Sequence, residues 1–510
     1  MNVVANQAAT SGISHRGLIT ISVMLASVLQ SLDNTIANVA LPHIQGSLSA
    51  TQEQMGWVLT SYIVAAAIMT PLAGWLAGPL GRKKMFVVSI AAFTIASALC
   101  GMAQSLSQLV FFRLVQGLAG ASLVPLSQAV LLDVYPREQH GRATALWAMG
   151  ITVGPILGPL LGGWLTEYHS WRWVFLINVP FGILALAGVS AFVPEQRNKY
   201  SPFDFFGFMT LSLAVGGLQI MLDRGQLLDW FNSNEIMIEA VVASLALYLF
   251  LVHSFTAKHP FVSLALFKDR NYAIGCTFMF VMGLSLFATL ALLPPLLQNL
   301  MNYPVVTTGL VTAPRGLGAF LSMFLVGRLV SKVDARILIG TGLALTAVSM
   351  WGMTGFSAQM DSWPVIWTGF LQGTAMGFTF VPLTAAAFAT LHSSLRNEGT
   401  SMFSLLRNIG SSIGIAMVAA LLTRNSQIMH ARLSEHVTPY DLATRAHLGY
   451  VEATSGGLAS LNGIVSKQAA MIAYNNDFKL LLIITIITFP LVLFLRAPAR
   501  SATSPSVAVE

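Results

Sequence analysis

Apolar runs of about 20 residues recur along the whole chain, and short polar segments separate them. A run of this length forms a helix that crosses a hydrocarbon core of roughly 30 Å. Charged residues make up only 9% of the sequence, whereas a typical soluble domain carries roughly 25%. A soluble chain of this size could not cover its surface with so few charges. The sequence therefore predicts an all-α polytopic membrane protein.

Fourteen spans are predicted, at residues 17–40, 54–78, 84–103, 108–131, 142–165, 172–193, 204–222, 235–255, 271–293, 304–327, 336–354, 363–387, 399–423 and 478–496. An even number of spans places both termini on one side. Most of the 27 basic residues lie in segments on that side, whereas the short segments on the other side hold only Arg172 and Arg224. The positive-inside rule then predicts that both termini are cytoplasmic.

The two halves of the chain share an internal repeat. The stretch QGLAGASLVPLS (116–127) resembles QGTAMGFTFVPLT (372–384), with one inserted residue. The spans then divide as 6+2+6: residues 1–200 form an N-terminal six-helix bundle, 201–262 a two-helix insertion and linker, and 263–510 a C-terminal six-helix bundle with a long outer loop at 424–477. Two repeated bundles with a binding cavity between them are typical of transporters.

The energy source is inferred from missing motifs. No lysine follows a glycine, so the sequence contains no Walker A loop, and no histidine pair has metal-ligand spacing. We therefore expect no cofactor, no metal site and no enzyme activity. The net charge of +7 is explained by the topology and does not indicate a nucleic-acid partner. An ion gradient is the remaining driver.

The first span carries polar side chains where lipid is expected. Ser27, Gln30, Asp33, Asn34 and Asn38 recur at intervals of about three to four residues, which predicts that they share one stripe of a helix. Such a stripe must face protein or a wet cavity, because an ionised carboxylate is costly at membrane depth and is a functional candidate by default.

Asp33 and Arg113 are predicted to pair. At 1.5 Å per residue, Asp33 lies roughly 24 Å and Arg113 roughly 27 Å from the inner ends of their spans, so the two side chains lie at the same depth. The first hypothesis is that Asp33 carries the proton and that Arg113 holds it ionised after the proton leaves. The alternative is a permanent salt bridge that fixes two helices. In the second half of the repeat, Gly369 occupies the position of Arg113, so the fold itself does not require a cation there.

The fifth span has glycines at a strict four-residue interval. These residues and their neighbours are Gly150, Gly154, Pro155, Gly158, Pro159, Gly162 and Gly163. Small residues on one face allow two helices to approach closely, so we expect a tight seam or a bend there, with ligand contact as a second interpretation.

Further polar residues at membrane depth are candidates for substrate binding or gating: Gln30, Asn34, Asn38, Gln116, Arg315 and Arg407. For Arg407 a structural or gating role competes with substrate contact. One deep acid against three deep arginines favours lipophilic weak acids, fatty acids or neutral amphiphiles as cargo. Methionine and phenylalanine linings would suit a broad apolar specificity.

Four motifs together resemble a known family: LDNTIANVALP (32–42), GWLAGPLGRKK (74–84), LVFFRLVQGLAGA (109–121) and GPILGPLLGG (154–163). They are similar to motifs of the major facilitator superfamily, and specifically of its fourteen-span drug:proton antiporters of the EmrB/QacA type. The resemblance implies proton-coupling roles for Asp33 and Arg113. It also implies an inner-loop gating motif, in which Gly74, Gly81, Arg82 and Lys83 match. Gly78 stands where the superfamily usually has an acid, so a charge relay through that position is not implied.

The same resemblance predicts the function. It implies a proton-driven exporter of hydrophobic toxic compounds in the bacterial inner membrane. The expected partners are an EmrA-like periplasmic adaptor and a TolC-like outer-membrane channel, which would dock at the long outer loop 424–477. A second reading is a proton-coupled transporter of one specific metabolite on the same fold, and a third is a membrane-embedded enzyme or sensor.

Overall fold

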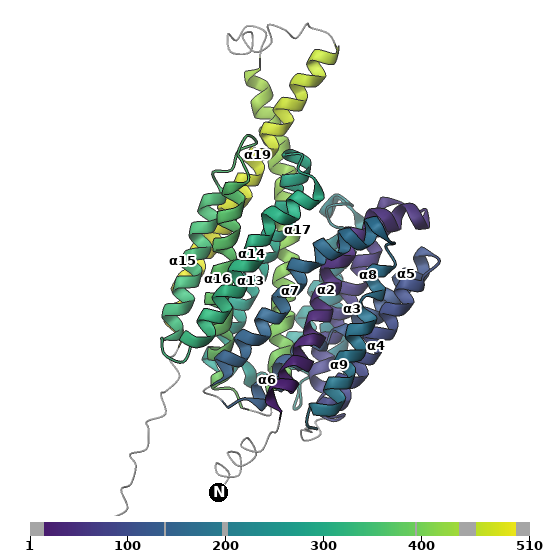
Figure 1. The fold of residues 1–510 in the computed structure, drawn as a ribbon, viewed down its shortest axis with the longest axis vertical. Coiled ribbons are helices and arrows are strands. Elements are labelled where there is room, and N and C mark those ends of the chain that lie inside the picture. Colours follow the sequence, from purple (N-terminus) through teal and green to yellow (C-terminus); the bar gives the residue numbers. More distant parts are fainter. Residues whose placement is uncertain (1–14, 137–138, 196–201, 393–394, 438–454, 496–510) are drawn as a thin grey trace, which may run out of the picture.

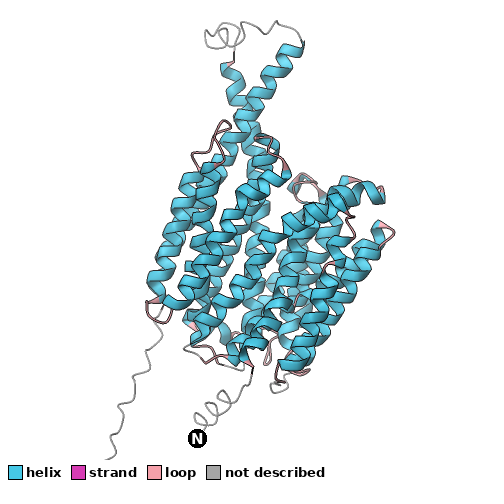
Figure 2. Ribbon diagram, viewed as in Figure 1, coloured by secondary structure: helices cyan, strands magenta, loops and turns pink. Residues whose placement is uncertain are grey.

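The described chain is entirely helical apart from its turns and loops. A computed structural model describes residues 15–136, 139–195, 202–392, 395–437 and 455–495. Within these ranges every regular element is a helix (Figure 2). Below, "lower" and "upper" refer to Figure 1, where the N-terminus lies at the lower side.

The described residues up to position 195 supply eight helices. They are α2 (Arg16–Leu48), α3 (Gln52–Leu76), α4 (Arg82–Met102), α5 (Leu106–Gly120), α6 (Leu123–Val134), α7 (His140–Tyr168), α8 (Trp173–Leu176) and α9 (Asn178–Phe192). Local sequence sets several of their ends. Thr51 and Gln54 form a capping box at the start of α3, and the side chain of Ser105 accepts a hydrogen bond from Gln108 N at the start of α5. The predicted span 108–131 is divided between α5 and α6.

The rest of the chain supplies α10 (Phe205–Arg224), η2 (Trp230–Asn232), α11 (Asn234–Thr256), α12 (Ala265–Lys268), α13 (Arg270–Pro295), η3 (Leu296–Leu300), α14 (Val305–Leu329), α15 (Ala335–Met353), α16 (Trp363–Ala389), α17 (Arg396–His436), α19 (Ser455–Thr488) and η5 (Phe489–Phe494). Aspartates cap three of these helices at their first turns: Asp204 for α10, Asp269 for α13 and Asp334 for α15.

Twelve segments of the described residues are long and apolar enough to cross a membrane. The helices α7 and α16 are not among these twelve segments, but with 29 and 27 residues they are as long as the others. Both are rich in glycine, proline and threonine because they pack against other helices. The chain thus has the all-helical fold predicted from its sequence, and these two helices complete the fourteen spans.

The helices gather into two groups that lie side by side (Figure 1). In one group α2 packs against α7 and α9, and α5 packs against α3 and α4; in the other α13 packs against α17, and α16 against α14 and α15. The groups meet where α7 contacts α14 and α16 and where α17 contacts α3 and α6. They diverge towards the upper end (Figure 1). The division at residues 1–200, 201–262 and 263–510 stays a prediction.

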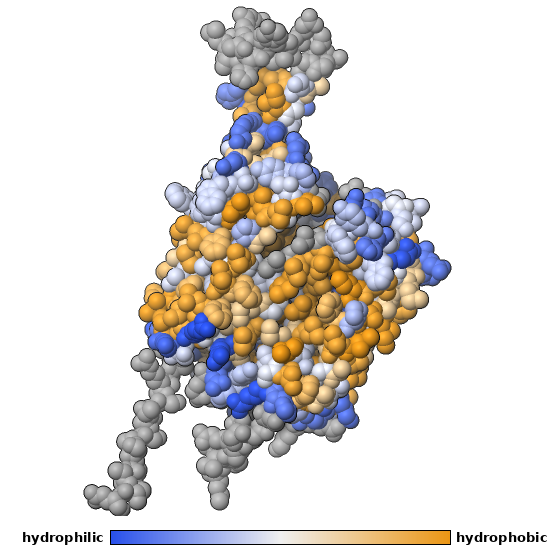
Figure 3. All heavy atoms as spheres, viewed as in Figure 1, coloured by the Kyte–Doolittle hydropathy of each residue, from blue (hydrophilic) through white to orange (hydrophobic). Residues whose placement is uncertain are grey.

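The middle of the molecule presents apolar side chains outward. Figure 3 shows an orange band between blue upper and lower rims. Large hydrophobic side chains are exposed on several helices in this band, among them Val88, Ile95, Phe111, Leu245 and Ile486. Since a soluble protein rarely exposes such a continuous apolar surface, this band is the part that contacts lipid.

The described residues of the predicted outer loop 424–477 are almost all helical. The helix α17 continues upward to His436, and α19 begins at Ser455 and runs down into the bundle. The two helices form a hairpin that rises above the rest of the molecule (Figure 1). Residues 438–454 lie outside the described part. Asp477, which the sequence placed at the end of the loop, lies inside α19 and is buried.

Candidate functional site

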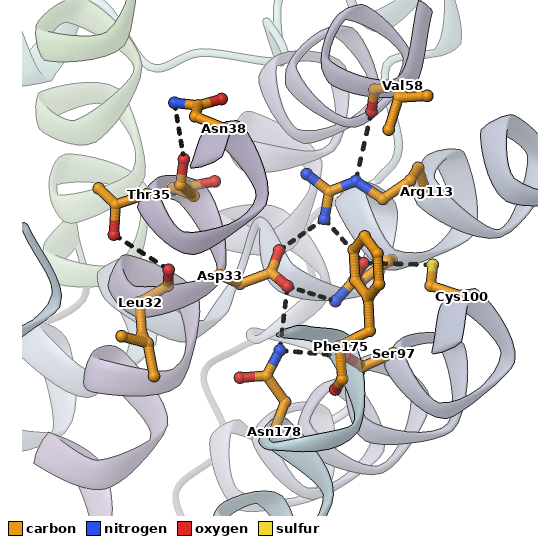
Figure 4. A network of polar contacts seen from close by, with 12 residues as sticks. Leu32, Asp33, Thr35, Asn38, Val58, Ser97, Cys100, Arg113, Phe175 and Asn178 are labelled. Carbon is orange, nitrogen blue, oxygen red and sulfur yellow. Dashed lines mark hydrogen bonds and ion pairs between the residues drawn. The ribbon is translucent and has the colours of Figure 1, made fainter. Parts of the chain in front are cut away.

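A buried ion pair joins α2 to α5, as the depth argument predicted. Arg113 Nη1 lies 2.7 Å from Asp33 Oδ2. The side chain of Asp33 is 0% exposed and that of Arg113 is 1% exposed. A fully buried carboxylate is tolerated only with an opposite charge and further hydrogen bonds, because its desolvation is costly. Both requirements are met here (Figure 4).

Two amide side chains complete the surroundings of Asp33. Gln116 Nε2 donates to Asp33 Oδ1 at 2.9 Å, and Asn178 Nδ2 donates to the same oxygen at 3.0 Å. The amide of Asn178 also donates to Ser97 Oγ at 3.0 Å, and Ser97 donates to the carbonyl of Phe175 at 2.8 Å. Asp33 thus receives three donors from α5 and α9, which is the arrangement expected for an ionised carboxylate.

Arg113 has partners besides Asp33. Its Nη1 donates to Gln116 Oε1 at 2.9 Å, and its Nε donates to the carbonyl of Val58 at 3.3 Å. The guanidinium carbon lies 4.2 Å from the centre of the Tyr62 ring and 5.6 Å from that of Phe175. Aromatic faces attract a cation. The guanidinium is therefore held on several sides even without the carboxylate.

Sequence reasoning missed three members of this cluster: Tyr62, Ser97 and Asn178. Gln116 was predicted as a substrate or gating residue, but its amide binds Asp33. A signal for two of the missed residues was present, because Ser97 and Asn178 are polar residues inside predicted apolar spans. Polar residues in a membrane helix face protein or water.

The repeat places a related but uncharged contact in the other half of the molecule. Gln372, the counterpart of Gln116, donates from Nε2 to Thr289 Oγ1 at 3.1 Å. Thr289 therefore stands where Asp33 stands in the first half. Gly369, at the position of Arg113, has the Cβ of Arg315 as its neighbour, 3.7 Å from where its own Cβ would lie. The ion pair belongs to one half of the repeat only.

The predicted polar stripe of α2 is partly wrong. Ser27 and Asp33 are buried, whereas Asn34 and Asn38 are exposed. The side chain of Asn38 lies on the opposite side of the helix from Asp33 (Figure 4). Consecutive residues are about 100° apart around a helix, so Asn34 does not share the direction of Asp33. Gln30 accepts a hydrogen bond from the backbone of Val124 at 3.2 Å and fixes α2 to α6.

The glycines of α7 form a tight seam with α2. A Cβ on Gly154 would lie 2.7 Å from Leu32 N, and one on Gly158 would lie 2.8 Å from Thr35 Cβ. Similar contacts are made at Gly150 with Met24 and at Gly162 with Ile36. Hydrogen bonds from Ser31 to the Ile151 carbonyl and from Thr35 to the Gly154 carbonyl join the same two helices.

One residue of this motif does not belong to the seam. A Cβ on Gly163 would have no neighbour within 4 Å, so an added methyl group would meet open space. The side chains of Pro155 and Pro159 lie outside the described part, and α7 is a continuous helix through both positions.

Arg315 and Arg407 lie in α14 and α17, which both pack near α13. Arg315 is 9% exposed; its Nη2 donates to the carbonyl of Leu286 at 3.3 Å and its Nη1 has no hydrogen-bond partner. Arg407 Nη2 donates to Asn408 Oδ1 at 3.5 Å, and its Nε has no partner. Neither guanidinium forms an ion pair with a described acid. They lie apart from the Asp33 cluster, in the other half of the repeat.

The inner-loop motif packs at the lower contact between the two groups. A Cβ on Gly74 would lie 2.9 Å from Ser401 Cβ of α17, and Gly81 precedes α4 with a positive φ of 90°. Lys83 is partly exposed. Arg82 forms an ion pair with Asp133 at the end of α6.

Asp133 is the acidic partner of the inner-loop motif. Arg396 of α17 approaches the same carboxylate, with 2.5 Å between its Nη1 and Asp133 Oδ1, and also donates to the Leu132 carbonyl at 3.0 Å. One carboxylate thus binds two arginines, Arg82 from one group of helices and Arg396 from the other. This ion pair ties the groups together at the lower end.

Among the described residues, no group of three or more histidine, cysteine or acidic side chains is placed to hold a metal ion. The geometry is that of a multi-pass membrane protein with the Asp33–Arg113 ion pair buried in one half of an internal repeat. The ion pairs of Asp133 with Arg82 and Arg396 join the two groups of helices. These features are those of a secondary transporter.

Comparisons with known proteins place the chain in a family. The model of the Major Facilitator Superfamily matches residues 23–415. The fatty acid resistance protein FarB of Neisseria gonorrhoeae is 38% identical over 500 residues, which cover 95% of this chain and 96% of FarB. The multidrug export protein EmrB of Escherichia coli is 37% identical over 488 residues, covering 94% of this chain and 95% of EmrB.

Solved structures share the fold. The human organic anion transporter MFSD10 (TETRAN) is similar with a TM-score of 0.60 and 15% identity, covering 92% of this chain and 99% of that one. The proton:xylose symporter XylE gives the same TM-score with 14% identity, covering 91% and 94%. The chain therefore belongs to the Major Facilitator Superfamily, and it is a membrane transporter and not an enzyme.

Proposed function

We propose that the protein is a proton-driven exporter of hydrophobic compounds, with Asp33 as the residue that carries the proton. The observation that supports this role is the buried carboxylate with three donors and an arginine beside it. FarB is named for fatty acid resistance and EmrB for multidrug export, and both align with nearly the whole chain.

Protonation of Asp33 would weaken the contacts between α2 and its neighbours. A neutral carboxyl no longer attracts Arg113, and the amides of Gln116 and Asn178 lose a charged acceptor. Arg113 would remain on the rings of Tyr62 and Phe175 and on the Val58 carbonyl. The helix α2, which also forms the glycine seam with α7, would then be free to move relative to α5 and α9.

The cargo is proposed to bind near the cations of the second half. Arg315 and Arg407 are guanidinium groups at membrane depth with unused donors and no described acid as partner. A lipophilic weak acid, such as a fatty acid or an acidic uncoupler, would supply the missing negative charge and place its apolar part among the surrounding helices. The name of FarB agrees with this cargo class.

The proposed orientation has both termini in the cytoplasm of a bacterium, with the lower side of Figure 1 facing inward. The hairpin of α17 and α19 would then project into the periplasm. There it would bind an EmrA-like adaptor that leads to a TolC-like outer-membrane channel. Its two helices rise clear of the other helices and are accessible to such a partner (Figure 1).

Export by purified protein in liposomes tests the coupling. An imposed pH gradient should drive movement of a lipophilic sulfonate, which stays ionised and carries no proton through lipid by itself, in the wild type. Asp33→Asn should lose the response to the gradient. Asp361→Asn, which changes an exposed acid between α15 and α16, should behave as the wild type. Full gradient-driven export by Asp33→Asn would refute the assignment. Transport of one metabolite alone, in place of several hydrophobic compounds, would favour the second reading of the sequence.

A further inference from the structure

Asp477 is a buried acid that the mechanism above does not use. It lies in α19 and is 1% exposed. Neither Oδ1 nor Oδ2 has a hydrogen-bond partner. Asp33 is equally buried, but it has an arginine and two amides as donors. The two carboxyl groups are therefore in opposite environments within one conformation.

An ionised Asp477 is not compatible with these surroundings. Burying a carboxylate without a partner costs several kcal/mol or more, and such a group takes up a proton instead. Its neighbours Phe478 and Leu481 are buried members of an apolar cluster that also contains Met353 and Phe356. The surroundings therefore favour the neutral form of Asp477, whereas the donors around Asp33 favour a carboxylate.

No charged side chain compensates Asp477 from the helices around it. The helix α19 packs against α13, α15, α17, η3 and η5. The titratable groups on these elements and on α19 itself are Tyr474, Lys467, Lys479, Arg270, Tyr272, Cys276, Arg336, Arg396, Glu398, Arg407, Arg424, His430, Arg432, Glu435 and His436. None of them forms a described ion pair or hydrogen bond with Asp477. Lys479 and Arg424 are exposed.

The position of Asp477 along α19 sets its depth in the membrane. From Asp477 the chain descends about 17 Å in α19 and about 12 Å in η5, so Asp477 lies near the upper surface. The loop that follows α15 packs against the same turns of α19: Asn475 Nδ2 donates to the Phe356 carbonyl at 3.0 Å, and the rings of Phe356 and Phe478 lie 5.7 Å apart.

We propose that Asp477 is a second proton-binding site of this transporter, which exchanges its proton with the upper side. The inference rests on the proposed proton-driven export for its coupling, but the buried neutral carboxyl stands without it. A second carboxyl that binds and releases a proton in each cycle would move one proton more per cargo molecule than Asp33 alone.

Infrared difference spectroscopy of the purified full chain in lipid tests the protonation state. At neutral pH the wild type should show a protonated-carboxyl band that is missing from Asp477→Asn and present in Asp361→Asn. A spectrum of Asp477→Asn identical to that of the wild type would overturn the proposal. Asp477→Glu keeps a carboxyl and should retain a shifted band, so the comparison remains possible if the asparagine variant folds poorly.

Reversal potentials in liposomes test the coupling, with a lipophilic sulfonate as the probe, because a sulfonate stays ionised and carries no proton through lipid by itself. The number of protons per cargo molecule should fall by one in Asp477→Asn and keep the wild-type value in Asp477→Glu and Asp361→Asn. An unchanged ratio in Asp477→Asn would refute the second site. If the wild type shows no proton-driven transport at all, the proposed function fails, and the infrared band alone then decides the state of Asp477.

Discussion

Some of the side chains around Asp33 could be predicted from the sequence, and others could not. The depth of two residues along their spans was enough to predict that Asp33 and Arg113 meet. The contribution of Asn178 could not be predicted in this way, because the turn between α8 and α9 decides which way its amide points. The separation of Asn34 and Asn38 from Asp33 was missed because a spacing of three to four residues defines a stripe only loosely.

Gln116 and Gln372 offer a matched pair of substitutions. Gln116→Leu removes a hydrogen bond to the Asp33 carboxylate, which is worth about 1.5–3 kcal/mol. We expect gradient-driven export to fall roughly tenfold or more. Gln372→Leu removes a bond to the neutral Thr289 and should reduce export far less. Equal losses in initial export rate from liposomes would contradict a special role for the first glutamine.

Asp204 should make stability depend on pH. Burial raises the pKa of Asp204, but hydrogen bonds from Gly207 N, His253 and Phe261 N, together with the nearby His253 ring, outweigh it and lower the pKa below its ordinary value. A lowered folded-state pKa adds stability that is present above the unfolded value, about 3.9, and is lost as the pH falls through the folded value.

Asp204→Asn tests this dependence. The variant should lose about 1–2 kcal/mol near neutral pH, because bonds to a charged acceptor become bonds to a neutral one. Thermal unfolding in detergent should show the difference from the wild type above roughly pH 5, and the difference should shrink below roughly pH 4. Asp269→Asn, which removes charge from a simple helix cap, should have a smaller effect. A difference that stays constant with pH would argue against the carboxylate.

At the scale of helices, the sequence predicted the elements better than their ends. Apolar runs located the spans, and the glycine interval in α7 predicted a close seam. Its partner α2 was not predicted, because the interval shows that a face is small and not which helix it meets. The length of α17 was also missed: polar residues after position 423 favoured a loop, yet the helix continues because α19 packs along it.

Alanine at two glycines of α7 tests the seam. Gly154→Ala would place a methyl group 2.6 Å from Ser31 C and 2.7 Å from Leu32 N, both backbone atoms that cannot turn away. We expect a loss of about 1–3 kcal/mol in stability and a lower export rate, because the two helices must separate. Gly163→Ala meets no atom and should be close to the wild type. Melting temperature in detergent is the measurement, and equal values for both variants would contradict a close seam.

For the molecule as a whole, the internal repeat predicted two related halves. It did not predict which residues join them, because Gly78 has no acid for a charge relay. Asp133 of α6 joins the two groups, with Arg82 and Arg396 as partners. No local pattern indicates that residues so distant in the sequence share one carboxylate. Their meeting depends on how the two groups of helices dock.

Asp133→Asn should weaken the contact between the two groups of helices at the lower side. It leaves two buried arginines without their charge partner, which weakens the closed arrangement. A cysteine at Ala145, which is 2% exposed and lies against Gly327 of α14, should then react faster with an impermeant maleimide in inside-out vesicles. Cys100 and Cys276 are buried and give little background. Asp334→Asn, an acid on the same side that caps only its own helix, is the control. Equal labelling of both variants would show that Asp133 does not hold the halves together.

The helix α17 is continuous, and it connects the lower contact between the two groups of helices to the projecting hairpin. Arg396, which grips Asp133, is the first residue of this helix, and His436 at the projecting tip is the last. Its 41 residues make a rod of about 60 Å. If the ion pair between Arg396 and Asp133 breaks and α17 tilts by about 10° around its lower end, its upper end moves by about 10 Å. A protein held at the tip would thus sense mechanically whether the opposite face of the membrane is open.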